Sequence, residues 1–143
     1  MSRAVEPPEG RGVFTRAFQP KPSDIDENGH VNNVVYLGWA QDLAIAHWRA
    51  RADPADQGAF AWVALRHEID YRRALVLGEA ALARTWVADR ADGPRFERFV
   101  RIDGPDGGMC AQVRTVWVLI EKASGRPRRV PERMVERFAR EDA

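Results

Sequence analysis

The stretch from Val34 to Arg51 constrains the fold more than any other part of the chain, because it predicts a long helix that must be largely buried. It contains no proline and a single glycine, and most of its residues favour helices. Apolar residues cover most of its circumference, and only Gln41, Asp42 and Arg49 form a narrow polar stripe. A helix with so little polar surface must be covered by the rest of the protein.

A cluster of polar residues lies directly before this helix. Its members are Asp24, Asp26, Gly29, His30, Asn32 and Asn33. Either asparagine can cap the helix by accepting a backbone N–H of the first turn. The two aspartates then lie just outside the positive end of the helix dipole, where negative charge is favoured. Folding alone does not explain so many polar groups at one helix entrance, so we expect the functional site here.

A calcium-binding loop of the EF-hand type is excluded for this cluster. Asp24, Asp26 and Asn28 match its first, third and fifth positions, but the twelfth position holds Val35 where a bidentate glutamate is required. Pro20 and Pro22 precede the loop and are incompatible with the entering helix of that motif. The three histidines and the single cysteine also lack the spacing of a zinc site, so we expect no metal and no cofactor.

The rest of the chain predicts mainly strands. We expect them over residues 13–18, 60–72, 79–88, 95–103 and 109–120, separated by glycine, proline and aspartate turns. Alternation in the second of these places Val63, Leu65, His67, Ile69 and Tyr71 on one face and Trp62 with the charged residues on the other.

Two further segments complete the pattern. Residues 53–58 are turn formers that end the long helix, and Pro131 opens a short helix whose inner side carries Met134, Val135 and Phe138. Strands that follow one another after a single helix predict an α+β domain with an antiparallel sheet.

The bulk properties of the chain indicate one cytoplasmic domain. Its 143 residues suffice for one core, which we expect over 12–140 after a loose tail over 1–11. The formal charge of +1 gives no reason to expect a nucleic-acid partner. Cys110 is the only cysteine and is expected to be a buried thiol. We find neither a signal peptide nor an apolar stretch long enough to cross a membrane.

The sequence around the polar cluster resembles a known family. The pattern Asp-x-Asp-x-x-Gly-His-Val-Asn-Asn-x-x-Tyr over 24–36, followed by a long buried helix, is similar to the 4-hydroxybenzoyl-CoA thioesterase-like branch of the hotdog superfamily. Residues 68–74 with Gly78-Glu79, and the stretch 125–132, resemble later parts of the same domain. The resemblance implies a single hotdog domain, in which an antiparallel sheet wraps around one long central helix.

The resemblance also implies an activity and its residues. It implies hydrolysis of an acyl-CoA or acyl-carrier thioester, with Asp26 as the catalytic carboxylate, either nucleophile or general base. A backbone N–H mapping to Asn33 would polarise the carbonyl, and His30 is a candidate for orienting the loop or titrating beside the substrate. The candidate substrate contacts are Asn32, Tyr36, His67 and Arg72. Each has a structural alternative: Asp26 could merely cap the loop, and His67 or His47 could be satisfied core histidines.

Coenzyme A would bring phosphates, which arginine binds through its planar fork. The candidates fall into three groups, namely Arg66, Arg72 and Arg73; Arg95, Arg98 and Arg101; and Arg126, Arg128 and Arg129. Trp39, Trp62 and Trp117 are candidates for lining or plugging the acyl pocket. Open sheet edges and the family resemblance together predict a homodimer or a dimer of dimers with its sites at the interface.

Two other functions remain open from the sequence. A non-catalytic acyl-CoA-binding protein would keep the pocket and the arginines while Asp26 served only as a cap. A hotdog hydratase or dehydratase would need a histidine set against a carboxylate, and only His30 is available for that role.

Overall fold

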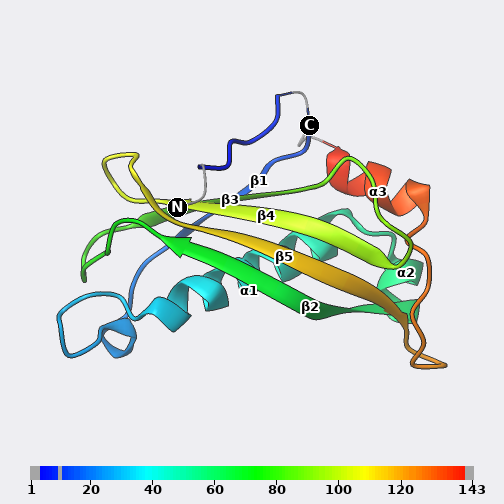
Figure 1. Ribbon diagram of the computed structural model, residues 1–143, viewed down its shortest axis with the longest axis horizontal. Coiled ribbons are helices and arrows are strands. Elements are labelled where there is room, and N and C mark those ends of the chain that lie inside the picture. The colour runs from blue at the N-terminus through cyan, green and yellow to red at the C-terminus, as the bar shows by residue number, and fades with distance from the viewer. Residues whose placement is uncertain (1–3, 10, 141–143) are drawn as a thin grey trace.

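A long helix packed in the curve of a five-stranded sheet forms the body of the protein (Figure 1). The computed structural model describes residues 4–9 and 11–140. The strands are β1 (Phe14–Phe18), β2 (Phe60–Tyr71), β3 (Ala81–Val87), β4 (Arg95–Asp103) and β5 (Met109–Glu121). The helices are η1 (Pro22–Asp24), α1 (Asn33–Arg51), α2 (Pro54–Ala59) and α3 (Glu132–Ala139). The predicted α+β arrangement is confirmed.

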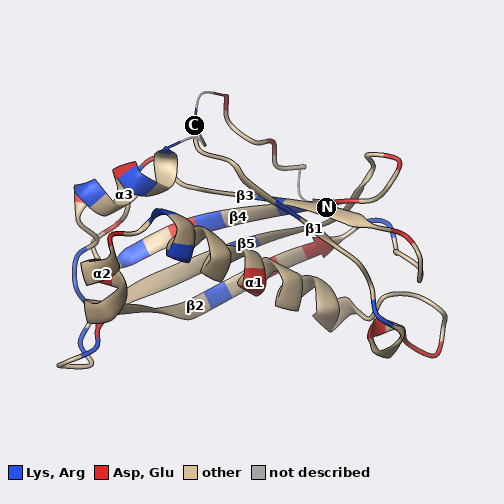
Figure 2. Cartoon of the chain, turned by 180° about the vertical axis from the view of Figure 1, so that it is seen from behind, with Lys and Arg blue, Asp and Glu red and all other residues tan. Residues whose placement is uncertain are grey.

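Helix α1 begins and is buried as its sequence pattern predicts. Asn32 is the N-cap, and its Oδ1 accepts the backbone N–H of Val34 at 3.2 Å. The helix carries few charges compared with the strands and α3, and Figure 2 shows it mostly uncharged in front of the sheet. Its buried residues are Tyr36, Trp39, Ala40, Leu43, Ala44 and His47. Several of them pack with residues of β3, β4 and β5 in the main core.

The sheet has the strand order β1-β3-β4-β5-β2, and every neighbouring pair is antiparallel. A second apolar cluster closes the end of the sheet at which α3 lies. It contains the three apolar residues expected on the inner side of α3, namely Met134, Val135 and Phe138, which are all buried. Strand β2 is an edge strand, so one side of its backbone has no partner strand within the described chain.

The alternation predicted for β2 is interrupted. The register against β5 shifts between Ala64 and Arg66, so Leu65 is an extra residue in a β-bulge. Trp62, before the bulge, therefore shares the helix side of the sheet with Ile69, after it, and both pack against core clusters. Val63 and Leu65 are instead 54% and 55% exposed. The prediction that these two share a face with Ile69 was wrong, because a bulge reverses the alternation.

Two helical details also differ from the prediction. Residues 54–59, expected as a turn, form α2, whose N-cap Asp53 accepts the N–H of Ala55 at 2.9 Å. Pro131 is the N-cap of α3 and not its first residue. Cys110 is buried, as expected.

The segment before β1 contacts the sheet. The backbone N–H of Val5 donates to Gln112 Oε1 at 2.7 Å, and Glu6 forms an ion pair with Arg101 at 2.7 Å. Residues 1–3 and 10 of the expected tail lie outside the described residues. None of the helices in the described ranges has the length and apolarity needed to cross a membrane.

Candidate functional site

The polar cluster before α1 folds into a compact loop. Asp24 Oδ2 accepts the N–H of Lys21 at 2.8 Å, and the carbonyl of Asp24 accepts the N–H of Asn32 at 2.8 Å. Ile25 and Val31 form an isolated bridge across the loop. Gly29 turns the chain with φ +80°, a conformation that residues with a side chain rarely adopt. The loop is therefore held by its own polar groups at the helix entrance.

Asp26 lies at the centre of this loop and is half-buried. Its Oδ1 accepts the backbone N–H groups of Asn28 at 2.9 Å and His30 at 3.2 Å. Its Oδ2 makes no hydrogen bond within residues 4–9 and 11–140. One oxygen thus fixes the orientation of the carboxylate, while the other is available to a substrate or a water molecule.

The N-terminus of α1 supplies a donor for a developing negative charge. The N–H of Val34 is taken by the Asn32 cap, and the N–H of Val35 donates to the carbonyl of Asn32 at 2.9 Å. The N–H of Asn33 has no acceptor in the described chain. Unpaired N–H groups at a helix start carry a partial positive charge, so this group suits an oxyanion.

A hollow of about 130 Å³ adjoins this helix start. Four of the residues predicted for the site line it, namely His30, Asn33, Tyr36 and Arg72. The other lining residues are Val31, Tyr71, Arg73 and Ala74. The Tyr71 hydroxyl donates to the carbonyl of Asn33 at 3.0 Å, which ties the end of β2 to the start of α1.

Tyr36 is a buried residue that lines this hollow. Its side chain is 2% exposed, and its hydroxyl accepts the N–H of Leu75 at 3.0 Å. Burial raises the pKa of Tyr36, so its hydroxyl stays neutral. It can therefore donate a hydrogen bond while it positions the segment that follows β2.

Other predicted site residues lie elsewhere. His67 Nδ1 is 2.8 Å from Thr115 Oγ1, and its ring contacts Trp117 edge-on, so neither hollow nor loop includes it. Asn32 is exposed and serves as the helix cap. Asp26 belongs to the loop and does not line the hollow. In the described ranges, no three histidine, cysteine, aspartate or glutamate side chains gather so that they could hold a metal ion.

Several of the candidate phosphate-binding arginines have carboxylate partners. Arg73 pairs with Glu79 at 2.9 Å, and Arg128 pairs with Glu121 at 3.1 Å. Arg101 pairs with Asp103 at 2.9 Å and with Glu6. Of the candidate arginines, Arg72 and Arg73 are the two that line the hollow at the helix start.

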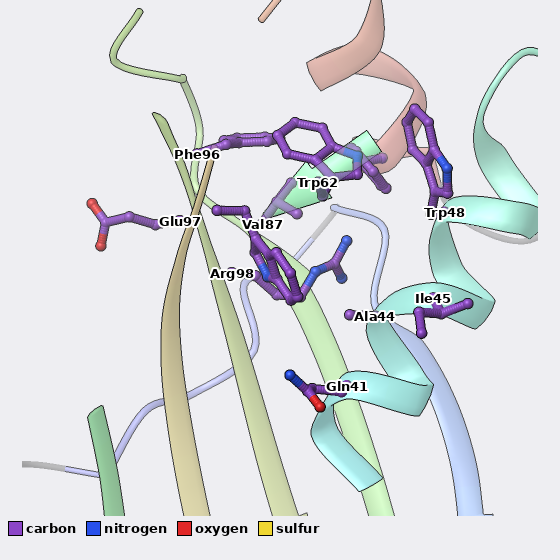
Figure 3. A pocket seen from close by; sticks show the side chains of 11 residues that line it. Gln41, Ala44, Ile45, Trp48, Trp62, Val87, Phe96, Glu97 and Arg98 are labelled. Atoms are coloured by element: carbon purple, nitrogen blue, oxygen red, sulfur yellow. The ribbon is translucent and has the colours of Figure 1, made fainter. Parts of the chain in front are cut away.

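A larger cavity of about 270 Å³ lies between the second half of α1 and the sheet (Figure 3). It is lined by Gln41, Ala44, Ile45, Trp48, Trp62, Val87, Phe96, Glu97, Arg98, Trp117 and Phe138. Of the three tryptophans expected to line or plug an acyl pocket, Trp62 and Trp117 line this cavity, whereas Trp39 is buried in the main core.

The sequence did not predict Arg98 as a cavity residue. It was expected with Arg95 and Arg101 in a group of candidate phosphate-binding arginines, but it is only 6% exposed and belongs to the cavity lining. Burial lowers the pKa of Arg98 to about 9. The signal was present in the sequence, since Arg98 has the same parity as Phe96 and Val100 on the inner face of β4.

Comparisons with known proteins identify the family of the chain. The family model described as the thioesterase-like superfamily matches residues 20–138. A search of curated protein sequences gives no significant match. Among solved structures, a Thermus thermophilus thioesterase complexed with coenzyme A and Zn is 28% identical, with a TM-score of 0.76, covering 91% of this chain and 94% of that one.

Two further structures show the same fold at lower identity. A hypothetical Staphylococcus aureus protein in complex with CoA is 17% identical, with a TM-score of 0.77, covering 95% of this chain and 85% of that one. A Synechocystis 1,4-dihydroxy-2-naphthoyl-CoA thioesterase is 19% identical, with a TM-score of 0.76, covering 89% and 96%. The chain therefore has the hotdog fold, belongs to the thioesterase-like superfamily and is a thioester hydrolase.

Proposed function

We propose that the protein hydrolyses acyl-CoA thioesters at the start of α1. The observation that carries this proposal is the N–H of Asn33, which has no acceptor among the described residues and borders a hollow beside the Asp26 loop. The thioester oxygen would accept this N–H, and the helix dipole would stabilise the negative charge that develops on it.

Asp26 either activates the attacking water or attacks the thioester carbon itself. As a general base, its Oδ2 takes a proton from water while the water oxygen bonds to the thioester carbon. As a nucleophile, it forms an acyl anhydride with that carbon, which water then opens. In both routes the carbon–sulfur bond breaks, the CoA sulfur takes up a proton, and the acid leaves.

Coenzyme A would enter over the arginines beside the hollow. Arg72 and Arg73 line it. The resemblance to two proteins solved in complex with CoA supports CoA as the ligand. Since CoA thioesters are made and used inside cells, the proposal includes a cytoplasmic location.

A panel assay tests the substrate class. Wild-type protein is offered short, long, aromatic and carboxylated acyl-CoAs, and free thiol is measured over time. We expect turnover of at least one class at a rate well above that without protein. If CoA binds and no member of the panel is hydrolysed, the proposal fails in favour of a non-catalytic acyl-CoA-binding protein.

The proposal includes a homodimer formed through the edge of β2. Its backbone edge has no partner strand among residues 4–9 and 11–140, and the apolar side chains Val63 and Leu65 are more than half exposed. Antiparallel pairing of two β2 strands would satisfy the backbone groups and cover these side chains. A dimer of dimers would need a second surface in addition to this one.

The Leu65→Glu variant is expected to make the protein monomeric at micromolar concentration. Two glutamates near a two-fold axis would repel each other and lose the apolar contact. Light scattering after size exclusion measures the mass. Leu82→Glu is the matched control, because Leu82 is 44% exposed on β3, away from the β2 edge. A dimer that survives Leu65→Glu would contradict this interface.

A further inference from the structure

Two residues that line the larger cavity carry buried hydrogen-bond donors without acceptors in the described chain. Trp62 Nε1 and Trp117 Nε1 are both buried, and neither has a partner among the described residues. Arg98 reaches between the sheet and α1 among the aromatic side chains (Figure 3). An unpaired buried donor is costly, so the two indole N–H groups, together with the charge of Arg98, favour a ligand that accepts hydrogen bonds.

The positive charge of Arg98 has no counter-ion among the described residues. Its Nη1 contacts His47 Nδ1 at 2.9 Å and donates to Thr85 Oγ1 at 3.0 Å, and its guanidinium lies 5.1 Å from the centre of the Phe138 ring. Neither group offsets this charge. Thr85 is uncharged, and His47 is neutral because burial and Arg98 lower its pKa to about 2.

The one carboxylate in the lining does not neutralise Arg98. Glu97 points away from the other lining side chains (Figure 3), and its Oε2 accepts Arg114 Nε at 2.6 Å. The Nε and Nη2 atoms of Arg98 make no hydrogen bond to a described residue. A guanidinium with two free donor atoms matches the paired oxygens of a carboxylate.

We propose that this cavity binds the far end of an acyl group that terminates in a carboxylate, so that the preferred substrates are monothioesters of dicarboxylic acids. The proposal rests on the thioesterase function proposed above and names its substrate class. The aromatic walls would contact the methylene chain, and Arg98 with the two indole N–H groups would bind the terminal carboxylate.

The proposed dimer brings this cavity near a thioester site. The cavity includes Trp62, near the start of β2, whereas Tyr71, at the end of β2, is hydrogen-bonded to the start of α1. A two-fold axis near Leu65 would place the start of one β2 beside the end of the other. The acyl group held at one helix start would then extend toward the cavity of the other subunit.

A matched pair of substrates tests the inference. Adipoyl-CoA and hexanoyl-CoA have the same chain length and differ by the terminal carboxylate. We expect wild-type kcat/KM to favour adipoyl-CoA at least tenfold. In Arg98→Met, the ratio of kcat/KM for adipoyl-CoA to that for hexanoyl-CoA should fall about 10- to 100-fold, the range for a lost charged hydrogen bond. Equal wild-type values for the two substrates would overturn the inference and leave the thioesterase function standing.

Direct binding separates the two proposals. Three of the five tryptophans line the cavity, so free adipate should change the intrinsic fluorescence of the wild type and not that of Arg98→Met. Arg114→Met, on the neighbouring strand, is the matched control and should behave as the wild type. If Arg98→Met fails to fold, Arg98→Lys decides the question, since it keeps the charge without the fork and should show a reduced preference for adipoyl-CoA. Adipate binding without hydrolysis of any acyl-CoA would support the cavity assignment and overturn the proposed activity.

Discussion

Replacing Asp26 by asparagine is expected to lower kcat for thioester hydrolysis by about 10²- to 10⁴-fold, the usual range for removal of a general base. The loop geometry lets this substitution separate catalysis from loop structure. The side-chain oxygen of asparagine can still accept the N–H groups of Asn28 and His30, so the loop should keep its fold. What it lacks is the charged Oδ2, which can no longer take a proton or attack a carbonyl carbon.

Two companion variants separate catalysis by Asp26 from capping. Asp26→Ala removes both oxygens and should lose activity together with some stability, since an uncapped loop typically costs about 0.5–2 kcal/mol. Asp24→Asn is the matched control, because Asp24 also caps backbone, through the N–H of Lys21. It should keep kcat within a few-fold of the wild type. Normal turnover in Asp26→Asn with a loss only in Asp26→Ala would make Asp26 a structural cap.

The parts of the fold that the sequence predicts well are those set by local pattern. The bounds of α1 differ from the prediction by one residue, because a proline-free apolar stretch after Asn32 leaves little choice. Strand β4 matches its predicted bounds, since buried and less buried residues alternate from Phe96 to Ile102 between two turns. Helix α2 was missed because Asp53 and Pro54 favour a helix start as well as a turn.

The parts that the sequence does not predict depend on contacts between strands. The bulge at Leu65 becomes visible only in the register against β5, and it decides that Trp62 turns inward and Leu65 outward. The hollow that gathers His30, Asn33, Tyr36 and Arg72 requires the end of β2 to meet the start of α1. The family resemblance suggested those residues one by one and could not predict which of them would be neighbours.

The free energy of unfolding is expected to fall steeply as the pH drops below about 6.5, because of His47. This side chain is 0% exposed, and its pKa is lowered to about 2 by burial first and by Arg98 and Arg51 next. Between pH 6.5 and 2, the unfolded chain therefore binds a proton that the folded protein excludes. Stability from this group is complete above pH 6.5 and declines by about 1.4 kcal/mol for each pH unit below it.

Urea unfolding of the wild type and His47→Asn at fixed protein concentration, at pH 7.5 and 4.5, measures this contribution. Asparagine can keep an acceptor for Arg98 and does not titrate, so the variant should lose about 2.7 kcal/mol less than the wild type between the two values. Arg98→Met is the informative control: burial is the largest cause of the shift, so this variant should retain most of the wild-type pH dependence. An equal loss in wild type and His47→Asn would mean that His47 takes up a proton inside the folded protein, and Arg98 would then need a nearby negative charge to offset it.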